Sequence, residues 1–177
     1  MPVELIRPQR SMEHEFMAMV EAFRAVGEDH FVDEPVLVEQ GFSAYVAWLE
    51  RGERGELKSD GLVAWSAFWA VEQSTGELVG ISSLRHELSP WMAEYGGHIG
   101  YRIRPACRRS GVGTQVLSMT LRRAAKRGIA HVLLICESEN VASIGVIRNN
   151  GGVFEREVAL EGRARRRYWV PASDAAI

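Results

Sequence analysis

The strongest constraint on the fold is a change in the spacing of apolar residues around Pro105. Residues 97–103 alternate as in a β-strand, whereas apolar residues over about 111–127 recur at helical spacing. Gly128 ends that helix, and the run 131–136 has the length and content of a buried strand. A strand, a helix and a strand in this order predict a right-handed crossover between two parallel strands.

The rest of the chain supplies mainly strands. Apolar residues at helical spacing from Phe16 to Phe23 predict a helix that Ser11 can cap, and those from Phe42 to Leu49 predict a second. The remaining patterns predict a helix over about 141–148 and strands over about 3–6, 62–72, 78–84, 153–159 and 166–170. Trp65, Phe68 and Trp69 are expected in the core. This order predicts an α+β fold with a mixed, mostly antiparallel sheet of about seven strands. Since 46% of the 177 residues are apolar, residues 1–177 are expected to form a single domain around one core.

The turn between the crossover strand and its helix has the composition of a phosphate-binding segment. It reads Arg108, Arg109, Ser110, Gly111, Val112, Gly113. Glycine lets the backbone approach a ligand closely, and the first amides of a helix have no acceptor within it. Those amides, the helix dipole and the arginines favour a pyrophosphate, although a solvated turn before an ordinary helix is the alternative. A P-loop is excluded because Thr114 and Gln115 replace its Lys-Ser/Thr pair.

Further features follow this segment in order and at compatible spacings. They are the buried strand 131–136, the stretch from Asn140 to Ser143, and the glycines after Asn150. With them, the chain resembles the GCN5-related N-acetyltransferase (GNAT) superfamily over nearly its whole length. Residues 85–105 are similar to a bacterial branch of predicted acetyltransferases.

The resemblance implies a GNAT-like sheet with helices on both faces and acetyl-coenzyme A (acetyl-CoA) as co-substrate. It also implies which groups bind that molecule. Backbone groups around Ile103 would hold the pantetheine arm, and the amides from Arg109 to Thr114 would hold the pyrophosphate. Asn140 would contact the pantetheine or its phosphate region.

The implied reaction is direct attack of a primary amine on the acetyl thioester. A lysine-type amine, with a pKa of about 10.4, is protonated at neutral pH, so the site needs a proton acceptor. The candidates are Glu94, His98 and Glu137. His98 has a suitable ordinary pKa and lies in the strand before the glycine segment, and Glu137 follows the buried strand. A solvated or capping role is the alternative for each of them.

The proton donor to the departing sulfur is less clearly indicated. Many relatives have a tyrosine for this role where this chain has Ile147. Ser143 lies where some relatives have a serine that hydrogen-bonds the sulfur, and we expect it to act in that way. A helix N-terminal serine that bonds its own backbone is the alternative.

The leading hypothesis is therefore an N-acetyltransferase that uses acetyl-CoA on a small-molecule amine or a peptide N-terminus. Because Ile147 replaces the tyrosine of many relatives, the alternative is a domain of the same fold that binds CoA without catalysis or acts as a sensor. No metal is expected, because His86 and Glu87 are adjacent and lack further ligands. The net charge of −2 disfavours nucleic acid and membrane as partners, and the basic run 162–167 is expected to be a solvated loop. No signal peptide or membrane span is recognisable, so we expect a cytoplasmic protein; a homodimer stays open.

Overall fold

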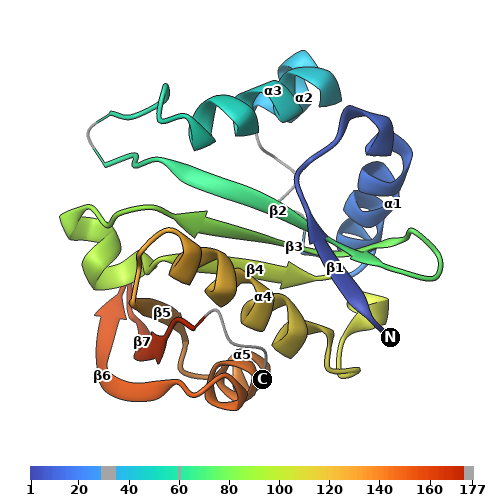
Figure 1. Cartoon of the computed structure of the whole chain (residues 1–177). Coiled ribbons are helices and arrows are strands. Elements are labelled where there is room, and N and C mark those ends of the chain that lie inside the picture. The colour runs from blue at the N-terminus through green and yellow to red at the C-terminus, as the bar shows by residue number, and fades with distance from the viewer. Residues whose placement is uncertain (29–34, 60, 174–177) are drawn as a thin grey trace.

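The computed structural model describes residues 1–28, 35–59 and 61–173. Figure 1 shows the elements, which follow one another as β1 (Val3–Ile6), α1 (Glu13–Arg24), α2 (Pro35–Gln40), α3 (Phe42–Glu53), β2 (Trp65–Glu72), β3 (Leu78–Arg85), β4 (Ile99–Ile103), α4 (Val112–Lys126), β5 (His131–Glu137), α5 (Val141–Asn149), β6 (Val153–Leu160) and β7 (Arg163–Pro171). A π-helical turn, η2 (Met92–Gly96), precedes β4, and a 3-10 turn, η3 (Pro105–Cys107), follows it. The α+β class and the predicted number of strands are confirmed.

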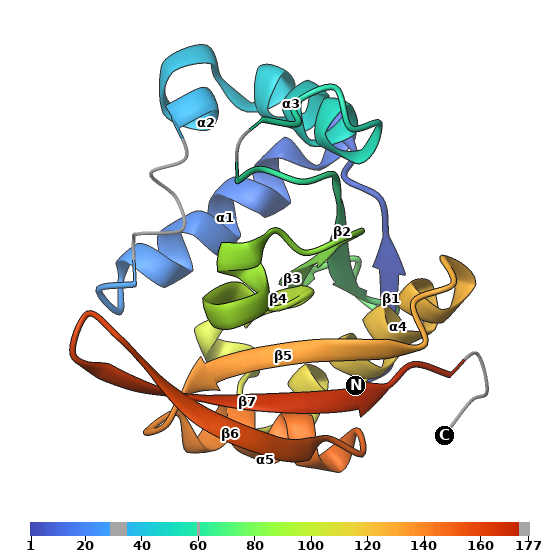
Figure 2. The same ribbon diagram turned by 90° about the vertical axis from the view of Figure 1, so that its left-hand side faces the viewer.

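The strands form two antiparallel sheets. One sheet has the order β1-β2-β3-β4 and the other the order β5-β7-β6 (Figure 2). β4 and β5, which were predicted to be parallel strands of one mixed sheet, lie in different sheets and form no ladder in the described part of the chain. The sheets meet at one backbone hydrogen bond, in which the amide of His98 donates to the carbonyl oxygen of Leu133 at 2.7 Å. The crossover helix is therefore present, but its two strands separate beyond this point.

A local contact accompanies the separation of β4 and β5. The amide of Leu133, which a parallel ladder would direct at β4 backbone, donates instead to the Nδ1 atom of the His98 ring at 2.9 Å. Gly97 brings the two backbones together, because a Cβ there would lie 2.6 Å from the carbonyl oxygen of Leu133. A side-chain acceptor thus takes the place of a backbone acceptor at this point, and beyond it the β4 edge has no strand partner among the described residues.

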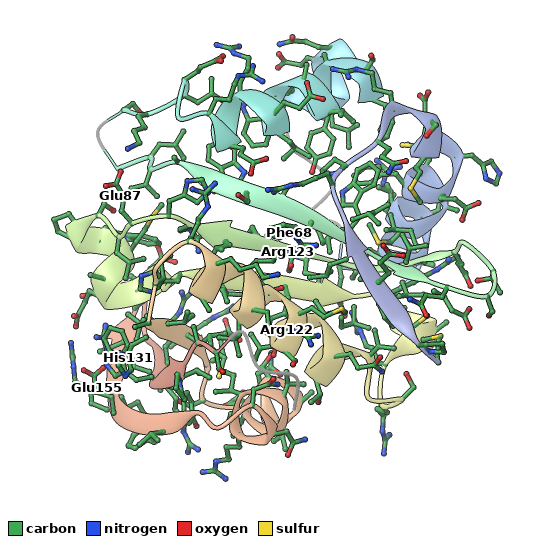
Figure 3. The ribbon with its side chains drawn as sticks, in the orientation of Figure 1. Phe68, Glu87, Arg122, Arg123, His131 and Glu155 are labelled. Atoms are coloured by element: carbon green, nitrogen blue, oxygen red, sulfur yellow. The ribbon has the colours of Figure 1, made fainter. Side chains whose placement is uncertain are left out.

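Helices cover both faces of the β1–β4 sheet, as the resemblance implied. Figure 1 shows α1 and α3 on one face and α4 on the other. Phe16, Met19 and Phe23 of α1 pack with Trp69 of β2 on the first face. On the second face, the core shared by α4, α5 and both sheets contains, among others, Phe68, Leu84, Ile99, Val116, Leu117, Leu134, Ile147 and Tyr168. Figure 3 labels Phe68 beside Arg123 of α4, whose Cζ atom lies 5.8 Å from the ring centroid.

Several local expectations are confirmed and two are wrong. Trp65, Phe68 and Trp69 are buried as predicted. Ser11 does not cap α1, because Met12 holds the N-cap position without a side-chain hydrogen bond. The basic run is not a solvated loop, because residues 163–167 belong to β7 and pair with β5 and β6. Among the helices of the described residues, none is long and apolar enough to cross a bilayer.

Candidate functional site

The glycine segment forms a turn with unused amides before α4. Arg109 and Gly111 both adopt left-handed conformations, with φ of 61° and 83°. The first backbone hydrogen bond of the helix is donated by Gln115 to the carbonyl oxygen of Gly111 at 3.2 Å. Within the described chain, the backbone amides of residues 109–114 donate no hydrogen bond to another protein atom. Consecutive free amides at a helix N-terminus are an anion-binding arrangement.

The side chains of this segment divide into two groups. Arg108 is held within the protein: its Nε atom donates to the carbonyl oxygen of Ile103 at 3.0 Å, and its two terminal nitrogens bond Glu28 at 2.8 and 2.6 Å. This pairing raises the pKa of Arg108. Ser110 is also engaged, because its hydroxyl donates to the carbonyl oxygen of Cys107. Arg109 is exposed to solvent, so among the predicted arginines it is the one placed to reach a ligand.

The remaining predicted binding residues join three elements. Ile103 ends β4, and its side chain packs against the core that β4 shares with α4. Val112 is fully buried, and a Cβ at Gly113 would lie 3.1 Å from the Cγ2 atom of Val146, so α4 approaches α5 closely here. Asn140 is the N-cap of α5: its Oδ1 atom accepts a hydrogen bond from the amide of Ser143 at 2.9 Å.

Tyr101, which the sequence analysis did not single out, has a buried hydroxyl without a hydrogen-bond partner among the described residues. It lies on β4, on the face that packs against the α4 core. Burial raises the pKa of Tyr101 to about 12, the neighbouring Ser143 hydroxyl lowers it, and Cys136 raises it further. A buried unpaired hydroxyl costs about 1–3 kcal/mol, which a ligand atom accepting its proton would offset. Its sequence signal was weak, because a tyrosine in a strand is ordinarily a packing residue.

Cys136 lies on β5 close to that hydroxyl and packs against the same core. Burial raises the pKa of its thiol to about 11. A thiol is nucleophilic only as its thiolate, so Cys136 is poorly suited to form a covalent intermediate at neutral pH. This agrees with the expected direct transfer.

His98 has a structural bond that bears on its predicted role. Its Nδ1 atom accepts the hydrogen bond from the amide of Leu133, so the neutral ring carries its proton on Nε2. Burial, together with the nearby Arg85, lowers the pKa of His98. The ring is therefore neutral at pH 7 and presents an N–H group, not a lone pair, at its other nitrogen.

The two acidic candidates differ in their surroundings. Glu94 bonds Arg156 at 2.6 Å, and this pairing lowers the pKa of its carboxyl. Glu137 ends β5, is exposed, and accepts one hydrogen bond from Arg163 at 3.2 Å. Of the two carboxylates, Glu137 lies at the strand end where β5 has separated from β4.

A cavity of about 280 Å³ lies elsewhere, between α4, α5 and β1. Of the predicted site residues, Thr114 lines it, while Tyr101, His98 and Glu137 do not. The candidate site is therefore the free amides together with the unpaired β4 edge, because the cavity brings together only one of the predicted residues. No group of three His, Cys, Asp or Glu side chains suited to a metal is found in residues 1–28, 35–59 and 61–173.

Comparison with known families identifies the family to which the chain belongs. The profile described as an acetyltransferase (GNAT) domain matches residues 18–153, which is more than half of the chain. The chain belongs to the GNAT acetyltransferase family. No curated protein sequence matches it.

Solved structures of GNAT proteins share the fold over nearly the whole length. RimL, a ribosomal L7/L12 α-N-protein acetyltransferase solved with coenzyme A, has a TM-score of 0.68 at 19% identity, covering 98% of this chain and 96% of RimL. RimJ of Mycobacterium smegmatis, solved with a CoA-disulfide, has a TM-score of 0.72 at 16% identity, covering 96% and 82%. The microcin C7 self-immunity acetyltransferase MccE, solved with acetyl-CoA and AMP, has a TM-score of 0.67 at 14% identity, covering 96% and 92%. At these identities the likeness establishes the GNAT fold alone.

The residues of this GNAT chain fit an acyl-CoA molecule. Among the described residues the amides 109–114 have no acceptor, so they are available to a bound diphosphate. The β4 edge beyond His98 is unpaired and is available to the amide groups of a pantetheine arm. The orphaned Tyr101 hydroxyl lies farther along β4 from the diphosphate end.

Proposed function

We propose that the chain is an N-acetyltransferase, which transfers an acetyl group from acetyl-CoA to a primary amine by direct attack. The observation that carries this proposal is the run of free amides at residues 109–114 beside the unpaired edge of β4. Acetyl-CoA supplies the acetyl group as an activated thioester. In the transfer, the amine nitrogen bonds the acetyl carbon, the carbon–sulfur bond breaks, and the amine loses a proton.

The chain's own residues divide this work. The amides from Arg109 to Thr114 and the side chain of Arg109 bind the diphosphate, and β4 backbone near Ile103 aligns the pantetheine arm. Asn140 is proposed to add a contact through its amide nitrogen, because its Oδ1 atom is already used as the α5 cap. Arg108 acts indirectly by fixing the carbonyl oxygen of Ile103.

The hydroxyls of Tyr101 and Ser143 are proposed to meet the sulfur of the thioester. The unpaired Tyr101 hydroxyl and the nearby Ser143 support this placement. A hydroxyl with a pKa of about 12 is a hydrogen-bond donor at neutral pH and does not ionise. It would therefore stabilise the departing thiolate without transferring a full proton, which takes over part of the role that a tyrosine at position 147 would have.

For the proton acceptor, the geometry favours Glu137 over His98. The lone pair of the His98 ring is already used at Nδ1, so its Nε2 atom is a donor. Glu137 has an exposed carboxylate that accepts a hydrogen bond from Arg163. We therefore propose that Glu137 accepts the amine proton, directly or through water, and that His98 contacts the acceptor as a hydrogen-bond donor.

The test is release of CoA thiol from acetyl-CoA in the presence of a panel of primary amines. The proposal predicts turnover with at least one amine and CoA-dependent thermal stabilisation. Stabilisation by CoA with no turnover on any amine would instead favour the non-catalytic CoA-binding domain. Absence of both would reject the site.

A further inference from the structure

Arg85 ends β3 on the face of the sheet opposite to α4. Leu84 and Ile99 form a cross-strand pair and both enter the α4 core, so the next pair outward, Arg85 and His98, faces the other way. The amide of Arg85 donates to the carbonyl oxygen of His98 at 2.8 Å, which fixes the two side chains as neighbours.

The charge of Arg85 has no anionic partner in the described chain. Its one hydrogen bond runs from Nη1 to the carbonyl oxygen of Gly97 at 3.0 Å. Two other arginines that lose contact with water do have carboxylate partners: Arg7 pairs with Glu53 at 2.5 Å, and Arg167 pairs with Glu155 at 2.7 Å.

Arg85 is largely buried, so the lack of an anionic partner among the described residues carries an energetic cost. Burial lowers the pKa of Arg85, and within residues 1–28, 35–59 and 61–173 no acidic side chain opposes this effect. For Arg7 the same desolvation is opposed by Glu53. A cation taken out of water without a counter-charge is unfavourable, so a ligand anion would complete the environment of Arg85.

The groups beside Arg85 are also donors. The neutral ring of His98 presents its Nε2 proton, and Ser83 lies on the same face, paired with Gly100 across the strands. Among the described residues, a Cβ built at Gly100 would meet only the Ser83 hydroxyl within 4 Å, at 3.4 Å. A guanidinium fork with adjacent N–H and O–H groups suits a planar carboxylate.

The spacing along β4 links this surface to the proposed reaction. Tyr101, which the proposed function places at the thioester, is separated from His98 by roughly 10 Å at about 3.3 Å per residue. The side chains of Tyr101 and Arg85 point to opposite faces of the sheet, so an acceptor whose anion is held at Arg85 has to pass the edge of β4, unpaired in the described chain, to reach the thioester. Resting on the proposed function, we propose that Arg85 binds the carboxylate of an acceptor that carries its amine and its carboxylate in one small molecule, as an amino acid does.

Matched acceptor pairs test this proposal. Thiol release is measured with a set of amino acids and with their carboxamides at saturating acetyl-CoA. The wild type is expected to prefer the acids by at least about tenfold in kcat/KM, which is about 1.4 kcal/mol. Arg85→Gln retains a donor for the carbonyl oxygen of Gly97 and is expected to remove this preference by lowering kcat/KM for the acids alone. Arg7→Gln, at the paired arginine, is the control and keeps the preference.

Three results would overturn the assignment: equal rates with acids and amides in the wild type, an equal loss for both in Arg85→Gln, or transfer confined to peptide N-termini. If no amine releases thiol although acetyl-CoA binds, the acetyltransferase proposal fails first. Calorimetry of the amino acids against the CoA-bound protein then decides the role of Arg85. Saturable binding that Arg85→Gln abolishes would retain the carboxylate site, and absence of binding would reject it.

Discussion

Gly111 and Gly128 lie at the two ends of α4 and have nearly the same backbone conformation, with φ of 83° and 82°. A Cβ built at either residue meets no atom within 4 Å. An alanine at either position therefore adds left-handed backbone strain, about 1–2 kcal/mol, without a steric clash. For a chain of this size, each kcal/mol lowers Tm by roughly 2–4 °C. We predict that Gly111→Ala and Gly128→Ala lose similar amounts of stability.

The two variants are expected to differ in ligand binding. Gly111 lies among the free amides of residues 109–114, whereas Gly128 lies at the far end of the helix. On the proposed function, a methyl group at Gly111 would lie within the turn that holds the diphosphate and would disturb its hydrogen bonds to the amides. Loss of one charge-assisted hydrogen bond, about 1.5–3 kcal/mol, corresponds to a rise in Kd of roughly 10- to 150-fold. Gly128→Ala should leave Kd unchanged.

Thermal unfolding measures the shared strain, and calorimetry with acetyl-CoA measures Kd for each folded variant. Because alanine adds the same backbone strain at Gly111 and at Gly128, a difference in Kd between the two variants reports on binding and not on folding. An unchanged Kd in folded Gly111→Ala would refute the assignment of the diphosphate to this turn. An equal loss of affinity in Gly128→Ala would show that the effect comes from helix stability.

Other side chains give further predictions. Tyr101→Phe should lower kcat by about tenfold, the effect of one lost hydrogen bond; because the pKa of Tyr101 is about 12, the shape of the pH profile from pH 6 to 10 should not change, and an altered profile would contradict the donor role. Glu137→Gln should lower kcat by at least about tenfold with no change in acetyl-CoA affinity, whereas Glu94→Gln should not; equal effects would exclude Glu137 as the specific base. Burial lowers the pKa of His98, so the unfolded chain takes up its proton first as pH falls. The stability from this group is complete above pH about 6.5 and is lost as pH falls through the lowered folded pKa. His98→Asn, which keeps an acceptor for the amide of Leu133, should flatten that part of the denaturation profile, and an unchanged pH dependence would contradict the assignment.

The crossover and its glycine turn could be predicted from the sequence because their signals are local. The spacing of apolar residues in α4 specifies a helix, and the buried strand after Gly128 follows from its length and composition. Gly111 needs φ of 83°, a conformation that glycine adopts without strain, so its position in the turn was also recognisable.

Partners distant in sequence could not be predicted in this way. Arg108 was expected at a phosphate, but its guanidinium bonds Glu28, which precedes it by 80 residues. His98 was judged by its ordinary pKa, and the bond from the amide of Leu133 depends on how β4 and β5 come together. Neither of these contacts can be recognised from the residues next to Arg108 or His98 in the sequence.

The basic run before the C-terminus was misread for a related reason. A run of arginines between two strands is typical of a solvated loop, yet residues 163–167 form the start of β7. Arg167 is buried because Glu155 and two carbonyl oxygens of η2 accept its hydrogen bonds. Charge composition alone does not reveal such compensation, since the accepting groups come from a separate strand and turn.

The central claim is that the amides at the start of α4 bind the diphosphate of CoA. Titration of the ¹⁵N-labelled chain with CoA, followed by amide NMR shifts, tests it directly. The account predicts saturable shifts of the amide resonances of residues 109–114 and no comparable change at Gly128. Saturation of the protein with CoA while the resonances of residues 109–114 stay in place, or no saturable change anywhere, would contradict it.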